Sequence, residues 1–214
     1  MNNIKIKLLF VILFSLIVSI HSYAQNKTKI TLKEPRNNWG LGFVYSESGF
    51  GFSVGKYYTI GKSTDLFFNI LFSNVTDSRE IERYDLYGNP VVYGKVNRIF
   101  MFPLSIGINK ELFKGDLEGS FKPVINFGVA PTLILTNPYD KSFFNAIGYT
   151  TSKFAVGPFA GIGFNYSQSE NTSLNIRVGY YYLPVIGGGL QSLESSEISN
   201  VGGFQLSLGV NFLK

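Results

Sequence analysis

Large apolar residues alternate with small or polar residues over several long stretches of the chain. In the clearest stretch, apolar side chains occupy every second position: Phe100, Phe102, Leu104, Ile106 and Ile108. The same alternation covers residues 173–182 and 204–212. A period of two places successive side chains on opposite faces of a β-strand. These stretches therefore predict strands with one apolar face and one face rich in Gly, Ser and Asn.

Weaker alternation predicts five more strands, which cover residues 39–46, 50–59, 66–73, 121–133 and 154–166. Most of the predicted strands are about 8 to 14 residues long. Strands of soluble sheets are commonly about 5 to 6 residues long, and a tilted strand needs about 9 to 11 residues to cross a bilayer. The lengths therefore favour strands that span a membrane.

From the second predicted strand onward, the connections between strands alternate in length, whereas the first hairpin, which turns near residues 47–49, has a short outer loop and breaks the pattern. Short hydrophilic connections at residues 61–64, 110–118 and 167–171 alternate with long ones at residues 74–95, 136–149 and 184–199. Short turns at one end and long loops at the other are typical of outer-membrane barrels. The pattern predicts an all-β fold, an eight-stranded antiparallel up-and-down transmembrane β-barrel.

Composition indicates which face of each strand meets lipid. Only 15% of the residues are charged, whereas 16% are aromatic. A water-facing surface normally carries more Lys and Glu, and small residues suit the narrow interior of an eight-stranded barrel. We therefore expect the polar faces inside and the aromatic faces in lipid, with interfacial girdles that include Tyr57, Tyr58, Tyr166, Tyr180, Tyr181 and Tyr182. The alternative is a soluble β-protein with the apolar faces in its core.

The N-terminus has the pattern of an export signal. Lys5 and Lys7 precede an apolar run over residues 8–20, and Ser22 and Ala24 form a small-x-small cleavage pattern. The run is shorter than the roughly 20 residues of a spanning helix, which argues against an uncleaved anchor. We predict a cleaved signal peptide at residues 1–24, a short periplasmic leader at 25–38 and a barrel at 39–214. The expected location is the outer membrane of a Gram-negative bacterium.

Several kinds of chemistry are excluded by residue type. The chain has no cysteine, and its single histidine, His21, lies in the predicted signal peptide. A thiol nucleophile, a Ser-His pair and a histidine-ligated metal are therefore not available to the mature chain. We expect no enzyme activity, no cofactor and no metal. The mature chain would carry 19 − 2 = 17 basic and 14 acidic residues without a basic stripe, so we expect no nucleic-acid partner.

A few polar residues on the predicted inward faces are candidates for an interior network. Arg177 and Asn175 lie on the inward face of the seventh predicted strand, where a charge is costly unless it is paired or hydrated. Lys122 and Glu118 share a face near the short-turn end and could pair. Such a network could form a gate, or it could simply fill the barrel as a plug.

The first long loop holds the second group of candidates. Arg79, Arg83, Tyr84 and Tyr87 lie in a stretch of balanced charge that also contains several acidic residues. Cations beside tyrosines could recognise a protein partner or the lipopolysaccharide surface. The alternative is an ordinary solvated loop.

Five short motifs resemble a known family. They are the Ala24-Gln25 junction and the segments FPLSIGI at 102–108, KPVINFG at 122–128, GPFAGIG at 157–163 and LGVNF at 208–212. Together they resemble the small, porin-like outer-membrane β-barrel domain family common in Bacteroidota. The resemblance implies the barrel fold and is silent on activity. The sequence departs from the usual aromatic C-terminus, because Phe212 is followed by Leu213 and Lys214.

Together these patterns predict a structural or loop-mediated binding role in the cell envelope, with a plugged, non-catalytic interior. The expected partners are outer-membrane lipid and lipopolysaccharide, the barrel-assembly machinery during insertion, and an unidentified protein at the long loops. Two alternatives remain open. One is a narrow channel or an accessory of transport or secretion, and the other is a lipid-modifying outer-membrane enzyme that works without histidine.

Overall fold

The computed structural model describes residues 37–113, 120–169, 171–194 and 196–213, almost all of them in strands or the loops between strands. The predicted signal peptide and most of the predicted leader lie outside these ranges. In the part that is described, no helix is long and apolar enough to cross a membrane.

The elements follow one another along the chain as predicted, with additional short strands in the loops. The wall is formed by β1 (Asn37–Ser46), β2 (Gly49–Gly61), β3 (Thr64–Val75), β6 (Asn97–Glu111), β7 (Phe121–Val129), β8 (Thr132–Pro138), β9 (Thr151–Ala155), β10 (Pro158–Ser167), β11 (Thr172–Tyr181), β12 (Val185–Ile186) and β15 (Gly203–Leu213). The loops contain β4 (Glu82–Tyr84), β5 (Pro90–Val92), α2 (Phe143–Ala146), the 3-10 helix η1 (Ile147–Tyr149), β13 (Leu190–Leu193) and β14 (Ser196–Ile198). The first strand begins two residues before the predicted start of the barrel.

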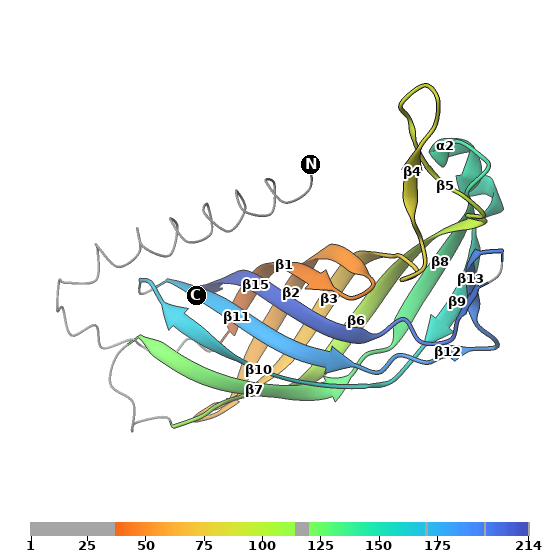
Figure 1. Cartoon of the computed structure of the whole chain (residues 1–214). Coiled ribbons are helices and arrows are strands. Elements are labelled where there is room, and N and C mark those ends of the chain that lie inside the picture. Colours follow the sequence, from red (N-terminus) through yellow and green to blue (C-terminus); the bar gives the residue numbers. More distant parts are fainter. Residues whose placement is uncertain (1–36, 114–119, 170, 195, 214) are drawn as a thin grey trace. The chain divides into compact units, whose positions relative to one another are not determined.

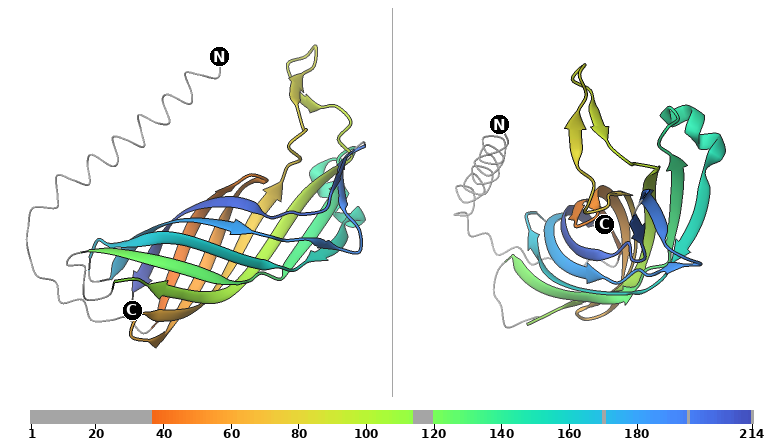
Figure 2. Two further views of the ribbon diagram at one scale, coloured as in Figure 1. Left: turned by 60° about the horizontal axis from the view of Figure 1, so that its bottom comes forward. Right: turned by 45° about the vertical axis from the view of Figure 1, so that its right-hand side comes forward.

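The strands form a closed antiparallel barrel, because the first strand, β1, pairs with the last, β15 (Figures 1 and 2). A row of paired residues that starts at Asn37 and follows the wall once around returns at Glu47, directly after the end of β1. Glu47 is 47 − 37 = 10 residues further along the chain than Asn37. This stagger tilts the strands and, with eight strands, leaves a lumen that side chains can fill. The predicted eight-stranded barrel is confirmed.

Three of the eight strands are each interrupted once without losing register. β7 continues as β8, β10 continues from β9, and β11 continues as β12, and the pairing of neighbours is the same on both sides of each break. Pro131 and Pro184 lie in two of these breaks. Proline has no N–H to donate to the ladder. The interruptions are therefore local losses of hydrogen bonding within continuous strands.

The long loops lie at one end of the barrel, which we call the loop end, and we call the opposite end the turn end. The turn end holds the connection at residues 62–63, and the loop end holds those at 76–96, 139–150 and 187–202, together with the short β1–β2 turn at 47–48. The β4–β5 hairpin projects from the loop end as an arm (Figure 1). The predicted alternation of short and long connections agrees with this arrangement.

The two faces of the wall have the predicted composition. On β6, Met101, Ser105 and Asn109 face inward and are buried. On the outside, large apolar side chains such as Phe43 and Phe52 remain exposed. The predicted orientation is wrong for Tyr57 and Tyr181, which point into the barrel instead of joining an outer girdle. Both lie on the inward register of their strands.

The interior changes character along the barrel axis. Toward the turn end it is filled by polar residues, including Ser53, Asn175 and Asn211. Toward the loop end it becomes an apolar core whose fully buried members include Ile99, Met101, Ile134 and Leu183. This core closes the lumen with side chains below the long loops.

Paired glycines make room for an aromatic ring inside the wall. Gly107 lies opposite Gly128, and a Cβ added at Gly107 would stand 3.0 Å from Cζ of Phe159 and against the carbonyl oxygen of Phe127. We predict that Gly107→Ala lowers the stability of the folded barrel by about 1–3 kcal/mol, because the ring and the neighbouring backbone must shift. The measurement is the temperature at which the fast-migrating unboiled gel band is lost.

Gly61→Ala is the matched control for this substitution. A Cβ at Gly61 would have Cβ of Thr64 as its nearest neighbour, at an ordinary 3.7 Å. The Gly61 variant should keep the wild-type transition temperature. Equal temperatures for both variants would contradict the packing role of Gly107.

Candidate functional site

An open polar cleft of about 560 Å³ lies at the loop end of the barrel. Its walls come from the inner faces of β8 and β9 and from the β13–β14 hairpin. The lining residues are Asn97, Thr136, Thr151, Lys153, Gly189, Leu190, Gln191, Glu194, Ser196 and Glu197. Hydroxyl and amide groups predominate among them, and Leu190 belongs to the apolar core beneath.

The β13–β14 hairpin is held against the start of β6 by main-chain hydrogen bonds. The N–H of Val96 donates to the carbonyl of Ser192 at 2.8 Å, and the N–H of Glu194 donates to the carbonyl of Gly94 at 2.9 Å. The side-chain amide of Asn97 adds a bond to the carbonyl of Gln191 at 2.7 Å. These bonds fix one wall of the cleft to a strand of the barrel.

A glycine turn forms the lip of the cleft. Gly187 and Gly188 have φ angles of 81° and 98°, a region that favours glycine. Lys153 Nζ donates to the carbonyls of Gly188 and Gly189, and Glu197 accepts from the N–H of Gly189 at 2.7 Å. Two charged side chains of the cleft therefore hold this glycine turn in place.

A buried polar cluster, which we call the latch, joins the first long loop to the last. Lys95 donates to Glu80 at 2.5 Å, and Ser192 donates to the same carboxylate. Asp77 accepts from Arg79 at 3.1 Å and from Ser196. The carboxylates of Asp77 and Glu80 are almost completely buried. This part of the loop is therefore packed structure and not the solvated segment that was the alternative.

The latch carboxylate of Asp77 has a strongly shifted pKa. Burial raises the pKa, but hydrogen bonds from Arg79 and Ser196 and the charge of Arg79 outweigh burial and lower it from 3.8 to about 2. Because the folded pKa lies below the unfolded value, this stabilisation is fully present above about pH 4. It is lost as the pH falls through about 2.

The other predicted loop residues lie on or beside the arm. The guanidinium of Arg83 lies 6.0 Å from the ring centre of Tyr93, and Tyr84 and Tyr87 are strongly exposed. The tip is ordered by Asp85, whose carboxylate accepts the N–H groups of Tyr87 and Asn89 at 2.8 Å each. These bonds, chiefly from Asn89, lower the pKa of Asp85. Arg79 thus belongs to the latch, and the other three predicted residues belong to the arm.

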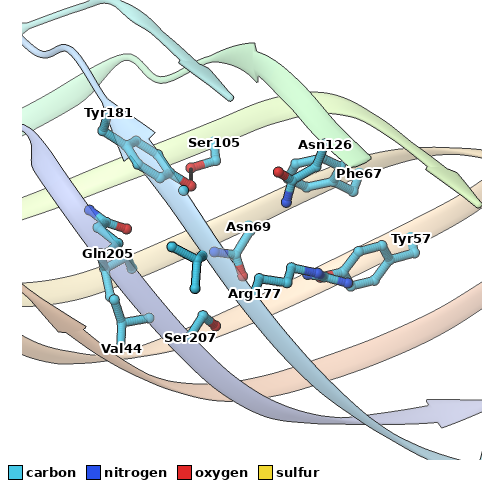
Figure 3. A pocket seen from close by; sticks show the side chains of 13 residues that line it. Val44, Tyr57, Phe67, Asn69, Ser105, Asn126, Arg177, Tyr181, Gln205 and Ser207 are labelled. Carbon is cyan, nitrogen blue, oxygen red and sulfur yellow. Dashed lines mark hydrogen bonds between the residues drawn. The ribbon is translucent and has the colours of Figure 1, made fainter. Parts of the chain in front are cut away.

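Inside the barrel, Arg177 is the central polar side chain (Figure 3). Its Nη1 donates to the hydroxyl of Tyr57 at 2.6 Å, and its guanidinium lies 5.3 Å from the centre of the Tyr57 ring. Asn175, which was predicted in the same network, donates to Asn211 at 3.2 Å instead. Cavities of about 50 Å³ and 30 Å³ adjoin Arg177, which is room for a few small molecules of water size.

The second predicted interior pair is described only in part. Lys122 lies 3.9 Å from Glu111 near the turn end, and this pair is partly exposed. Glu118 lies outside the described residues. The predicted pairing of Lys122 with Glu118 therefore stays a prediction.

Sequence reasoning missed Tyr57 and the latch for different reasons. Tyr57 was assigned to the outer girdle from its place near a strand end, although its parity with Ser53 and Gly55 would have placed it inside. The latch joins residues 112 to 119 positions apart, and no local pattern reports such a contact. Among the described residues, no three Asp, Glu, His or Cys side chains are grouped in a way that could hold a metal ion.

The sequence matches no protein-family model and no curated protein. Several solved structures, in contrast, resemble the fold of this chain. Neisserial surface protein A has a TM-score of 0.52 and 12% identity, and the match covers 83% of this chain and 94% of that one. The N-terminal barrel domain of OprF from Pseudomonas aeruginosa has a TM-score of 0.51 and 13% identity, and the match covers 84% of this chain and 98% of that domain. A major outer membrane protein from Thermus thermophilus has a TM-score of 0.52 and 15% identity, and the match covers 82% of this chain and 98% of that one.

These likenesses establish the fold of small outer-membrane barrels, in agreement with the predicted architecture. At such low identities they carry no activity over to this chain. They also do not distinguish the Bacteroidota family from other small barrels of the outer membrane.

We predict that Asp77→Asn loosens the latch, because the neutral amide loses the charge attraction and part of the hydrogen bonding of the carboxylate. The shift of the Asp77 pKa corresponds to about 2 kcal/mol. Amide hydrogen exchange in residues 190–198 should therefore quicken roughly tenfold or more. In the wild type, the same amides should lose protection as the pH falls from about 4 to 2.

Asp85→Asn is the control, since it removes a carboxylate from the arm tip and leaves the latch intact. It should accelerate exchange near residues 87–89 and leave residues 190–198 at the wild-type rate. Equal effects of the two variants on residues 190–198 would show that Asp77 does not hold the last loop.

Proposed function

We propose that this protein is a plugged outer-membrane barrel that binds a polar ligand outside the cell in the cleft at its loop end. The observation that carries the proposal is the difference in volume between the cleft at the loop end and the cavities inside the barrel. The cleft at the loop end offers about 560 Å³, whereas the two cavities beside Arg177 offer about 50 Å³ and 30 Å³. A ligand of ordinary size therefore fits at the loop end and not inside the barrel.

The outer surface supports a membrane location. Exposed aromatic and aliphatic side chains surround the wall, and on the outside near the turn end the Lys56 ammonium lies 4.5 Å from the centre of the Trp39 ring. A cation over an aromatic ring suits the boundary between lipid and water. The likeness to small outer-membrane barrels supports the same location.

The lining of the cleft favours a ligand rich in hydroxyl groups, such as the sugars of a surface glycan. Thr136 and Thr151 face each other across β8 and β9. Gln191 adds a side-chain amide, which also donates to the carbonyl of Glu194 at 3.0 Å. Of the three charged lining residues, Lys153 and Glu197 are already used in holding the glycine turn, and Glu194 is exposed. Neutral hydrogen-bonding groups that converge in a concave site discriminate in favour of polar, uncharged ligands.

The alternatives of channel and enzyme have less support. The core around Met101 and Ile134 fills the lumen between the cleft and the cavities beside Arg177, which argues against conduction. A non-catalytic role is the simplest interpretation of a site built from hydroxyl and amide groups. The barrel-assembly machinery remains the partner proposed for insertion, and an unidentified protein that contacts the arm remains a second proposed partner.

Lipid is a further proposed partner, with contacts that extend beyond the strands to the loop at residues 139–150. A row of phenylalanine rings runs along the outer wall into this loop. The ring centres of Phe72 and Phe100 are 6.1 Å apart, those of Phe100 and Phe143 are 6.2 Å apart, and those of Phe143 and Phe144 are 5.6 Å apart. Arg98 holds this loop through the carbonyls of residues 138, 139 and 141. The apolar wall thus continues into α2, and Lys141 on the same loop supplies a cation that could meet lipopolysaccharide phosphates.

Lipid contact of α2 can be measured with a fluorescent tryptophan. Trp39 is the chain's single tryptophan, so Phe144→Trp is made in a Trp39→Phe background. We expect brominated lipids to quench Phe144→Trp strongly, as they quench a Leu41→Trp variant on the lipid face. Tyr87→Trp on the arm should be quenched weakly. Equal weak quenching of Phe144→Trp and Tyr87→Trp would contradict lipid contact of α2.

Ligand binding is tested with intact cells that carry the protein and an array of defined bacterial and host oligosaccharides. We expect binding to at least one glycan, and an approximately tenfold or greater loss in the double variant Thr151→Val with Gln191→Ala, because buried hydrogen bonds to the ligand are lost. Tyr87→Ala on the arm is the control and should bind as the wild type does. Loss in the arm variant with retention in the cleft variant would overturn the proposed site.

A further inference from the structure

Arg177 carries a charge inside the barrel without a counter-charge beside it. Nη1 donates to Tyr57, whereas Nε and Nη2 are buried and have no partner among the described protein atoms. An arginine guanidinium remains protonated in proteins. The described residues that line the two cavities at Arg177 include no carboxylate.

An isolated charge in such a place is unfavourable unless something compensates it. Removal of an ion from water costs several kcal/mol even after the protein relaxes, and interior arginines are usually paired. Tyr57 supplies a hydrogen-bond acceptor and the face of an aromatic ring, and neither is a full negative charge. Two carboxylates on the inward faces of neighbouring strands have partners of their own. Asp65 accepts from Thr59 and Asn109. Glu111 lies beside Lys122.

The cavities beside Arg177 are lined by groups that can donate hydrogen bonds. The larger one is bordered by the amides of Asn69, Asn126 and Gln205 and by the hydroxyls of Ser105 and Ser207. Figure 3 shows these polar side chains together with Arg177, whose guanidinium points toward Tyr57. The smaller cavity adjoins Asn175 and Asn211.

We propose that the interior of the barrel binds a small monovalent anion, of the size of chloride, at Nε and Nη2 of Arg177. The guanidinium supplies charge and two N–H donors, and neighbouring amides and hydroxyls complete the coordination. The larger cavity, at about 50 Å³, accepts a halide with one or two waters and is too small for a nucleotide or a sugar. The anion neutralises the lone interior charge and thereby stabilises the plug.

The test compares thermal unfolding of the full-length barrel in chloride, bromide and gluconate at equal ionic strength. Gluconate is too large for the cavity and controls for screening. We expect chloride and bromide at about 150 mM to raise the midpoint by about 3 °C in the wild type and not in Arg177→Met. Lys122→Met, which removes an interior cation that already lies near Glu111, should keep the halide shift.

A crystal grown in bromide would locate the bound anion. We expect an anomalous bromide peak within contact distance of Arg177 Nε and Nη2. If Arg177→Met does not fold, the anomalous peak decides the proposal, and its absence at Arg177 would overturn it. Tyr57→Phe frees another N–H of the guanidinium and should keep or enlarge the halide shift. Equal midpoints of the wild type in halide and gluconate would overturn the proposal and show that water alone occupies the cavity. A halide shift that persists in Arg177→Met would overturn it as well.

Discussion

Closure of the hydrogen-bonded wall is the constraint on which the rest of this structure depends. In hydrocarbon each unpaired N–H or carbonyl costs several kcal/mol, so the first and last strands must pair with each other. β1 and β15 do so along nearly their whole length. The ten-residue stagger that accompanies closure tilts the strands and sets the width of the lumen. A lumen of this width is filled by side chains, which leaves the loops as the place where new space can open.

The wall could be predicted from sequence because its pattern is local. Alternation around Phe100 to Ile108 fixes both the strand and its lipid-facing side, and the same reasoning located every strand of the barrel. The candidate sites were harder to predict because they depend on contacts between distant segments. Arg177 was placed inside correctly, but its partner Tyr57 is 120 residues away. The cleft has no sequence signature, since it arises where the β13–β14 hairpin meets β6, β8 and β9.

The interior divides the molecule into three levels with different physical character. Polar residues and Arg177 occupy the level nearest the turn end, the apolar core around Ile99 and Leu183 lies above them, and the cleft opens above the core. The core isolates the charge of Arg177 from the cleft. It also gives the long loops a solid base, so that the hairpin and the latch can hold a concave surface although they lie beyond the regular wall.

The latch and the arm are ordered by different means, and this difference has a consequence for substitutions in the loops. Asp77 and Glu80 are tied to Ser196 and Ser192 on another loop, whereas Asp85 orders the arm tip through its own neighbours. A change in the length or composition of the arm tip therefore leaves the contacts of the other loops intact. The two latch segments must change together, because a new side chain on one of them leaves a buried carboxylate on the other without its partner.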